Sequence, residues 1–148
     1  MDLDRLKDLI KKYRENMKYY HDTKNAYNET ECRDEYINPL LECFGWDVQN
    51  VQGKLPQYKE VVVERFSNYS ERPDYTLTLN GVSKLFVEAK KPSVDIVVET
   101  EPAIQARKYG WKAKHAMVIR TNFEPMLRYE TTRNPAPGEK ATTEWDRI

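Results

Sequence analysis

Two acids and one lysine stand at the ends of two short apolar stretches. Asp74 follows Pro73 before the first stretch, and Glu88 and Lys90 close the second, within "RPDYTLTLNGVSKLFVEAKKP". Converging carboxylates repel each other unless a cation lies between them, and hard oxygen ligands favour Mg²⁺. A lysine beside such a site can orient an attacking water or stabilise charge on a phosphate. The alternative is ordinary, since Pro-Asp opens many turns and Glu-x-Lys is common on exposed strands.

The two stretches are predicted to pair as a hairpin. Asn80 and Gly81 form the dipeptide that most strongly indicates a two-residue hairpin turn. Side chains alternate between the faces of a strand, so Glu88 and Lys90 share one face. Pairing would place Asp74, at the start of the partner strand, beside them. We expect this strand face to be exposed to solvent.

The remaining elements are predicted from hydrophobic periodicity and from turn residues. We expect helices at 3–20, 29–44 and 99–113, and strands at 59–66, 74–79, 84–90, 115–121 and 126–132. The stretch 134–148 has turn formers and no clear period. A meander of three strands followed by a crossover helix and two more strands predicts an α/β fold, with a mixed central β-sheet flanked by helices.

The second helix has clear start and stop signals. Asn28 is suited to cap it, acids fill its first turn, and Gly45 ends it. Pro39 lies inside this helix and has no N–H to donate, so it should kink or strain the helix.

The acids and the lysine also carry a resemblance to a known family. Pro73, Asp74, Glu88 and Lys90 resemble the PD-(D/E)xK nuclease signature. The stretch "ETECRDEYINPLLECFGWDV", residues 29–48, is similar to the opening helix of the nuclease domain of type I restriction R subunits. The same type of domain opens fused restriction–methylation enzymes of the type IIG kind. The resemblance implies a restriction-endonuclease-like fold and an Mg²⁺ cofactor, with Mn²⁺ as a substitute.

Two further pieces support the same family. Gln105 and Tyr109 resemble the Q-x-x-x-Y motif of RecB-like members, and "RTNFEPMLRYE", residues 120–130, is similar to the Thr-Asn-Phe strand that follows. The resemblance covers roughly residues 28–130. It implies that Gln105 and Tyr109 support the lysine or hold the DNA backbone. One turn apart on a helix, they could equally form a surface pair.

The resemblance assigns roles at the centre of the site. Asp74, Glu88 and the carbonyl group of Ala89 would bind the metal, and Lys90 would position the attacking water.

The family also carries an acid on its opening helix, which maps to Glu31 or Glu35. The spacing of Glu31-x-Arg33 ahead of Ile37 favours Glu31. Both acids equally suit an ordinary role in a first turn, where negative charge stabilises a helix N-terminus.

One stretch, 103–122, contains no Asp or Glu and carries cations at Arg107, Lys108, Lys112, Lys114 and Arg120. It predicts either a surface that faces phosphates or a solvated helix face. With Tyr109, the cations Arg107, Lys108 and Lys112 are the predicted DNA contacts. The formal net charge of +0 counts against a strong stand-alone DNA binder.

Length and composition suit one compact domain of a cytoplasmic protein. The chain has 148 residues, of which 39% are hydrophobic and 32% charged. No apolar run approaches a membrane span, and the charged N-terminus is not a secretory signal. Cys32 and Cys43 are expected to be reduced thiols. We expect the nuclease domain with its N-terminal helices at 1–133, and a linker or the start of a next segment at 134–148.

Together these features predict an Mg²⁺-dependent endonuclease domain of a restriction–modification enzyme of the type I or IIG kind. It would hydrolyse phosphodiester bonds of double-stranded DNA, with the remaining domains or subunits of that system as partners and no membrane. The alternative is a catalytically inactive nuclease-fold module that binds DNA or a partner protein. A third possibility is a charge pattern without any site, which metal would not stabilise.

Overall fold

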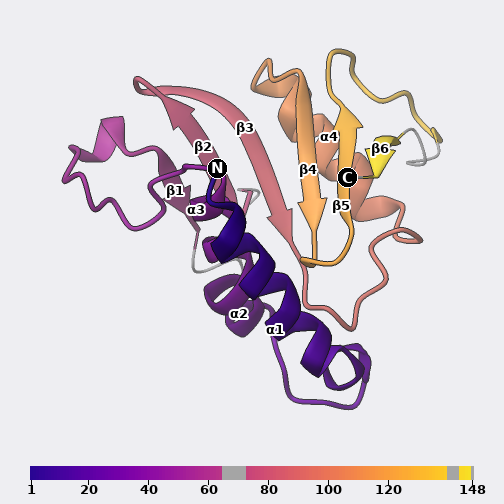
Figure 1. The fold of residues 1–148 in the computed structure, drawn as a ribbon. Helices are drawn as coiled ribbons and strands as arrows, with labels where there is room; N and C mark the ends of the chain where they lie inside the picture. Colours follow the sequence, from indigo (N-terminus) through magenta and orange to yellow (C-terminus); the bar gives the residue numbers. More distant parts are fainter. Residues whose placement is uncertain (65–72, 140–143, 148) are drawn as a thin grey trace.

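The computed structural model describes residues 1–64, 73–139 and 144–147 (Figure 1). The helices are α1 (Leu3–His21), α2 (Glu29–Cys32), the π-helical turn η1 (Arg33–Ile37), α3 (Asn38–Cys43), the 3₁₀ turn η2 (Pro56–Tyr58) and α4 (Glu101–Lys112). The strands are β1 (Val61–Val63), β2 (Tyr75–Leu79), β3 (Val82–Ala89), β4 (Met117–Thr121), β5 (Met126–Glu130) and β6 (Glu144–Arg147).

The strands form one mixed sheet of six in the order β1-β2-β3-β4-β5-β6. Strands β3 and β4 pair in parallel, and the other neighbours pair antiparallel. Helix α4 provides the crossover that a parallel pair requires. The predicted α/β class with a mixed sheet flanked by helices is confirmed.

The sheet has an apolar cluster on each face. Helices α1 to α3 cover one face, where Tyr36 and Ile37 pack against Tyr75 and Val87. Helix α4 covers the other face, where Ala103 and its neighbours pack against β4 and β5. Figure 1 shows α1 crossing in front of the sheet and α4 lying behind it. The predicted site lies at one end of these layers, where β2 begins and β3 ends.

The predicted hairpin between β2 and β3 is confirmed. Asn80 and Gly81 both have left-handed backbones, with φ angles of 51° and 77°, as a two-residue hairpin turn requires. A Cβ atom on Gly81 would lie 3.2 Å from the carbonyl oxygen of Gln57, so the turn also packs closely. Tyr75 pairs with Val87, which aligns the start of β2 with the end of β3.

The second predicted helix forms, with a change of geometry in its middle. Asn28 caps it as expected and accepts a hydrogen bond from the Glu31 N–H at 2.9 Å. The turn before Pro39 widens to π geometry, and the Asn38 N–H donates to the carbonyl oxygen of Arg33, five residues back. A π turn of this kind lets a helix continue past a residue that cannot donate.

Two predictions about the sheet edges need correction. The stretch 134–148 contains strand β6, which pairs with β5, although its sequence shows no strand period. The described part of the strand expected at 59–66 is shorter, because β1 covers only Val61–Val63; residues 65 and 66 lie outside the described residues. Among the helices that the structure describes, none has the length and apolar character of a membrane span.

Candidate active site

Asp74 and Glu88 lie together at the end of the β2–β3 pair. Oδ2 of Asp74 accepts a hydrogen bond from the Ala89 N–H at 2.7 Å, which fixes the acid against the end of β3. Asp74 is only 6% exposed, so the expectation of a solvent-exposed face is wrong for this residue. The reason is that the helix formed by α2 and η1 packs over the strand end, so that Arg33, the first residue of η1, lies against Asp74.

The Glu88 carboxyl group is strongly perturbed by this environment. Burial raises the pKa of Glu88 to about 8, and the charge of Asp74 and a hydrogen bond with it add to the rise. The charges of Lys90 and Arg120 act in the opposite direction. Without a metal ion, the Glu88 carboxyl group therefore keeps its proton near neutral pH. A carboxyl group with a pKa perturbed in this way is a common feature of functional sites.

Lys90 and Arg120 place positive charge on either side of Glu88. Lys90 follows β3 directly, and its N–H donates to the carbonyl oxygen of Thr121 at 3.0 Å. Arg120 is the parallel partner of Glu88 in the sheet and is 1% exposed. Its guanidinium donates to Glu99 at 2.8 Å, so it is held beneath the segment that leads into α4.

The acid that α2 contributes to this site is Glu29. Burial raises the pKa of Glu29, and the nearby charge of Asp74 adds to the rise, while Lys90 and Arg33 oppose it. Sequence reasoning missed this residue. The available signal was its position one helical turn before Arg33, which puts both side chains on one helix face.

The structure does not bring Glu31 or Glu35 to the acid pair. Glu31 is exposed, and its carboxylate accepts from the Asn28 N–H at 2.9 Å in a reciprocal capping box. Glu35 accepts a hydrogen bond from the Tyr27 hydroxyl at 2.5 Å. The choice of Glu31 as the helical site acid is therefore replaced by Glu29, which lies two residues earlier on the helix.

Gln105 and Tyr109 bond to each other on α4. The Gln105 side-chain amide donates to the Tyr109 hydroxyl at 2.8 Å, and Gln105 is exposed. The spacing of one helical turn accounts for this pair. That they support Lys90 or contact DNA stays a prediction.

The expected basic surface over 103–122 is not continuous. Arg107 is 0% exposed, and its Nε donates to the carbonyl oxygen of Glu130 at 3.1 Å. Arg120 is buried as described above, while Lys108 and Lys112 are exposed. The prediction of Arg107 as a DNA contact is therefore wrong, because β5 and the segment after it cover that side of α4. Those residues lie too far along the chain for local sequence to reveal the contact.

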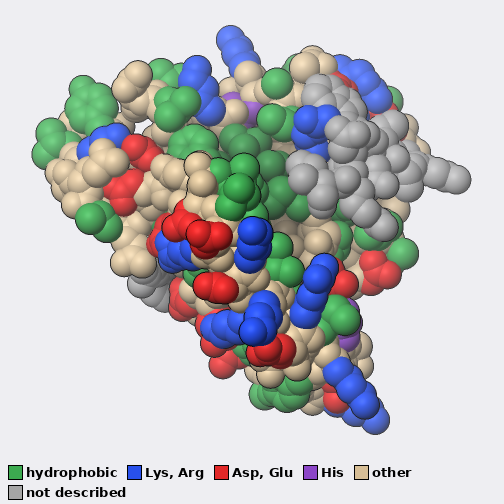
Figure 2. All heavy atoms as spheres, in the orientation of Figure 1, with side chains coloured by type: hydrophobic (Ala, Val, Ile, Leu, Met, Phe, Trp, Pro, Cys, Tyr) green, Lys and Arg blue, Asp and Glu red, His purple; other side chains and the backbone are tan. Residues whose placement is uncertain are grey.

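The face of the molecule that α1 crosses is not a single-sign surface either. Figure 2 shows Lys and Arg side chains mixed with Asp and Glu side chains there. This agrees with the net charge of +0.

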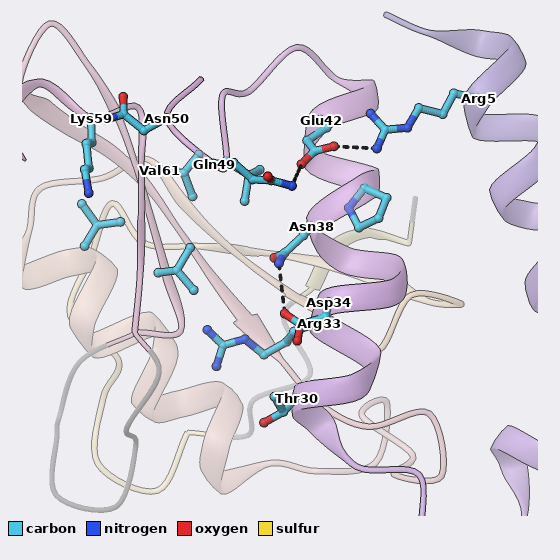
Figure 3. A pocket seen from close by; sticks show the side chains of 14 residues that line it. Arg5, Thr30, Arg33, Asp34, Asn38, Glu42, Gln49, Asn50, Lys59 and Val61 are labelled. Atoms are coloured by element: carbon cyan, nitrogen blue, oxygen red, sulfur yellow. Dashed lines mark hydrogen bonds and ion pairs between the residues drawn. The ribbon is translucent and has the colours of Figure 1, made fainter. Parts of the chain in front are cut away.

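A groove of about 750 Å³ lies between the helix formed by α2, η1 and α3 and the edge strand β1. Figure 3 shows Thr30, Asp34, Asn38 and Glu42 along its helical wall, with Lys59 on the opposite side. Arg33 lines this groove and also contacts Asp74, so it connects the groove to the acids.

Comparison with known proteins gives one informative relationship. No family profile matches the chain, and no solved structure matches it. The chain is 41% identical over 132 residues to the type II restriction enzyme and methyltransferase RM.Eco57I of Escherichia coli. The match covers 86% of this chain and 13% of that protein. The chain is therefore related, over most of its length, to a segment of a restriction enzyme and methyltransferase.

Proposed function

We propose that this chain is an Mg²⁺-dependent endonuclease domain that hydrolyses phosphodiester bonds of double-stranded DNA. The observation that carries the proposal is the meeting of Asp74, Glu88 and Lys90 at the end of the β2–β3 pair, with Asp74 bonded to the Ala89 N–H. The relationship to a restriction enzyme and methyltransferase supports the same reaction. The spacing of these residues resembles the PD-(D/E)xK nuclease signature, which supports the proposal.

The donor set fits Mg²⁺. Mg²⁺ keeps several of its waters and commonly takes only one or two protein carboxylates. Among the described residues, no three His, Cys, Asp or Glu side chains form a ready metal cage. The two acids of the pair, with the Ala89 carbonyl group, would be the protein ligands, and Mn²⁺ would substitute because it prefers the same oxygen donors.

We assign each residue of the proposed site a separate role in hydrolysis at the scissile phosphate. Bound Mg²⁺ would supply Lewis-acid stabilisation of negative charge on the phosphate. Lys90 orients the attacking water and adds positive charge beside the phosphate. Glu29 lies close enough to interact electrostatically with both Asp74 and Lys90, and it helps to hold these groups in place. Gln105 and Tyr109 steady Lys90 or the DNA backbone.

The setting of the domain is proposed from the relative. Because the chain spans 13% of that protein, the other parts of a restriction–modification enzyme, of the type I or IIG kind, are the expected partners. They would place DNA across the acids and confine cutting to the right sites in a cytoplasmic system.

Cleavage assays on the protein and its variants test this function. Lys90→Met should abolish Mg²⁺-dependent nicking of supercoiled plasmid DNA while leaving Mg²⁺ binding in place. Asp74→Asn should abolish both nicking and binding. If Mg²⁺ binds but neither the chain nor the full protein that contains it cuts DNA, the inactive DNA- or protein-binding module replaces the proposal.

A further inference from the structure

Arg33 is a buried cation that contacts two acids of the site. It is 7% exposed and begins the π turn η1. Its Nη1 lies 3.6 Å from Oδ1 of Asp74 and 3.9 Å from Oε1 of Glu29. One guanidinium group therefore links an acid at the start of β2 to an acid on α2.

Uncharged groups fix the orientation of this guanidinium. Its Nη2 donates to the carbonyl oxygens of Glu64, at 2.7 Å, and Asp74, at 3.2 Å. Its central carbon lies 4.9 Å from the centre of the Tyr75 ring, a cation–π distance. A planar fork with several donors is suited to such a site, whereas a lysine ammonium is not.

Burial makes the charge balance at this site important. Carboxylates held close together in a poorly hydrated site repel each other strongly. Arg33 makes ion pairs to both Asp74 and Glu29, and Lys90 adds a second positive charge nearby. Arg33 is thus placed to neutralise the acids that come from two different elements.

We propose that Arg33 is a positioning residue that serves as a built-in counter-ion. It holds Asp74 and Glu29 in place while no divalent cation is bound. The inference rests on the proposed metal site. It explains how acids that repel each other are kept in one arrangement, ready for a divalent cation, before that cation arrives.

The expected consequence concerns how much metal stabilises the protein. With Arg33 present, the acids are already partly neutralised, so Mg²⁺ adds a limited amount to stability. Without Arg33, the metal-free protein carries uncompensated acids, and Mg²⁺ relieves a larger repulsion. The rise in Tm on adding Mg²⁺ should therefore be larger in a variant that lacks this charge.

Thermal denaturation in chelator and in saturating Mg²⁺ tests the inference. Arg33→Met should lower Tm in chelator, and its Mg²⁺-induced rise should exceed that of the wild type by roughly 5 °C or more. Arg33→Lys keeps the charge but loses the fork, so its rise should be intermediate. Arg5→Met is the matched control, because Arg5 lines the same groove but pairs with Glu42, away from the acids.

The outcomes separate the inference from the proposed function. Equal Mg²⁺-induced rises in the wild type and Arg33→Met would overturn the counter-ion role and leave the metal site standing. A wild type that shows no rise would overturn the metal site and this inference with it. If Arg33→Met does not fold in chelator, the comparison passes to Arg33→Lys, whose rise must still exceed that of the wild type.

Discussion

Burial and a neighbouring acid act in the same direction on Glu88. Its pKa of about 8 means that the folded, metal-free protein holds this proton far more tightly than an unfolded chain does. The same site also holds Asp74 at 6% exposure and Arg33 at 7%. Both residues are buried because the helix formed by α2 and η1 packs over the strand end. This is a tertiary contact, so the sequence around Asp74 alone does not predict it.

The titration of Glu88 predicts a pH dependence of stability in chelator. A raised folded-state pKa contributes stability that is fully present below the unfolded pKa and is lost as pH rises toward about 8. We therefore expect Glu88→Gln to lose stability less than the wild type does between pH 6 and pH 8.5, as measured by urea denaturation. Glu15→Gln, an exposed acid on α1, is the control. Parallel pH profiles for Glu88→Gln and the wild type would contradict the assignment.

Arg107 and Lys108 are neighbours on α4, but their substitution should change the free energy of unfolding by different amounts. Arg107→Met leaves Glu130 and Glu139 without their buried partner, so it should cost roughly 2–4 kcal/mol of unfolding free energy. Lys108→Met should change stability by no more than about 0.5 kcal/mol, since Lys108 is exposed. Denaturant unfolding measures both. A neutral Arg107→Met would contradict the buried contact.

At the scale of elements, the hairpin turn and the register shift between Leu77 and Thr78 together place Asp74 beside Glu88. Gly81 and Gly53 both have left-handed backbones, with φ angles of 77° and 69°. A Cβ atom at Gly81 would meet the Gln57 carbonyl oxygen, whereas one at Gly53 would meet nothing within 4 Å. Substitution at Gly53 therefore measures the cost of backbone strain alone, and substitution at Gly81 measures backbone strain together with steric crowding.

Alanine at the two glycines should give different costs. Gly53→Ala should cost about 1 kcal/mol from backbone conformation alone. Gly81→Ala should cost roughly 2 kcal/mol, because the added methyl group also crowds η2. Urea denaturation of both variants provides the measurement. Equal costs would show that the turn tolerates the methyl group and that its packing is not tight.

The elements show where sequence reasoning succeeds. The Asn80-Gly81 turn predicted the hairpin because its signal is local, but regular pairing from that turn would place Asp74 opposite Val87. The bulge in the β2–β3 ladder, which the sequence did not reveal, shifts the register by one residue and brings Asp74 to Glu88. Strand β6 was missed because its pairing depends on the free edge of β5. Glu29 was missed because the capping box, which uses Glu31, and the π turn together decide which helix residues face the site.

At the scale of the whole molecule, the domain combines an internal acid site with an exterior on which positive and negative charges balance. The net charge is +0, and the face crossed by α1 mixes both signs (Figure 2). Phosphate contacts made by few cations give weak binding that falls with salt. If the proposed function is right, the domain would act on DNA that other parts of a larger enzyme hold in place.

Divalent metal binding at the acid pair is the central property of the proposed site. Calorimetric titration of the chain with Mn²⁺ and with Mg²⁺, in parallel with Asp74→Asn, Glu88→Gln and Glu15→Gln, measures it. We predict that the wild type and Glu15→Gln bind the metal and that Asp74→Asn and Glu88→Gln lose this binding while remaining folded. Absence of binding to the wild type, or unchanged binding to Asp74→Asn and Glu88→Gln, would contradict the account.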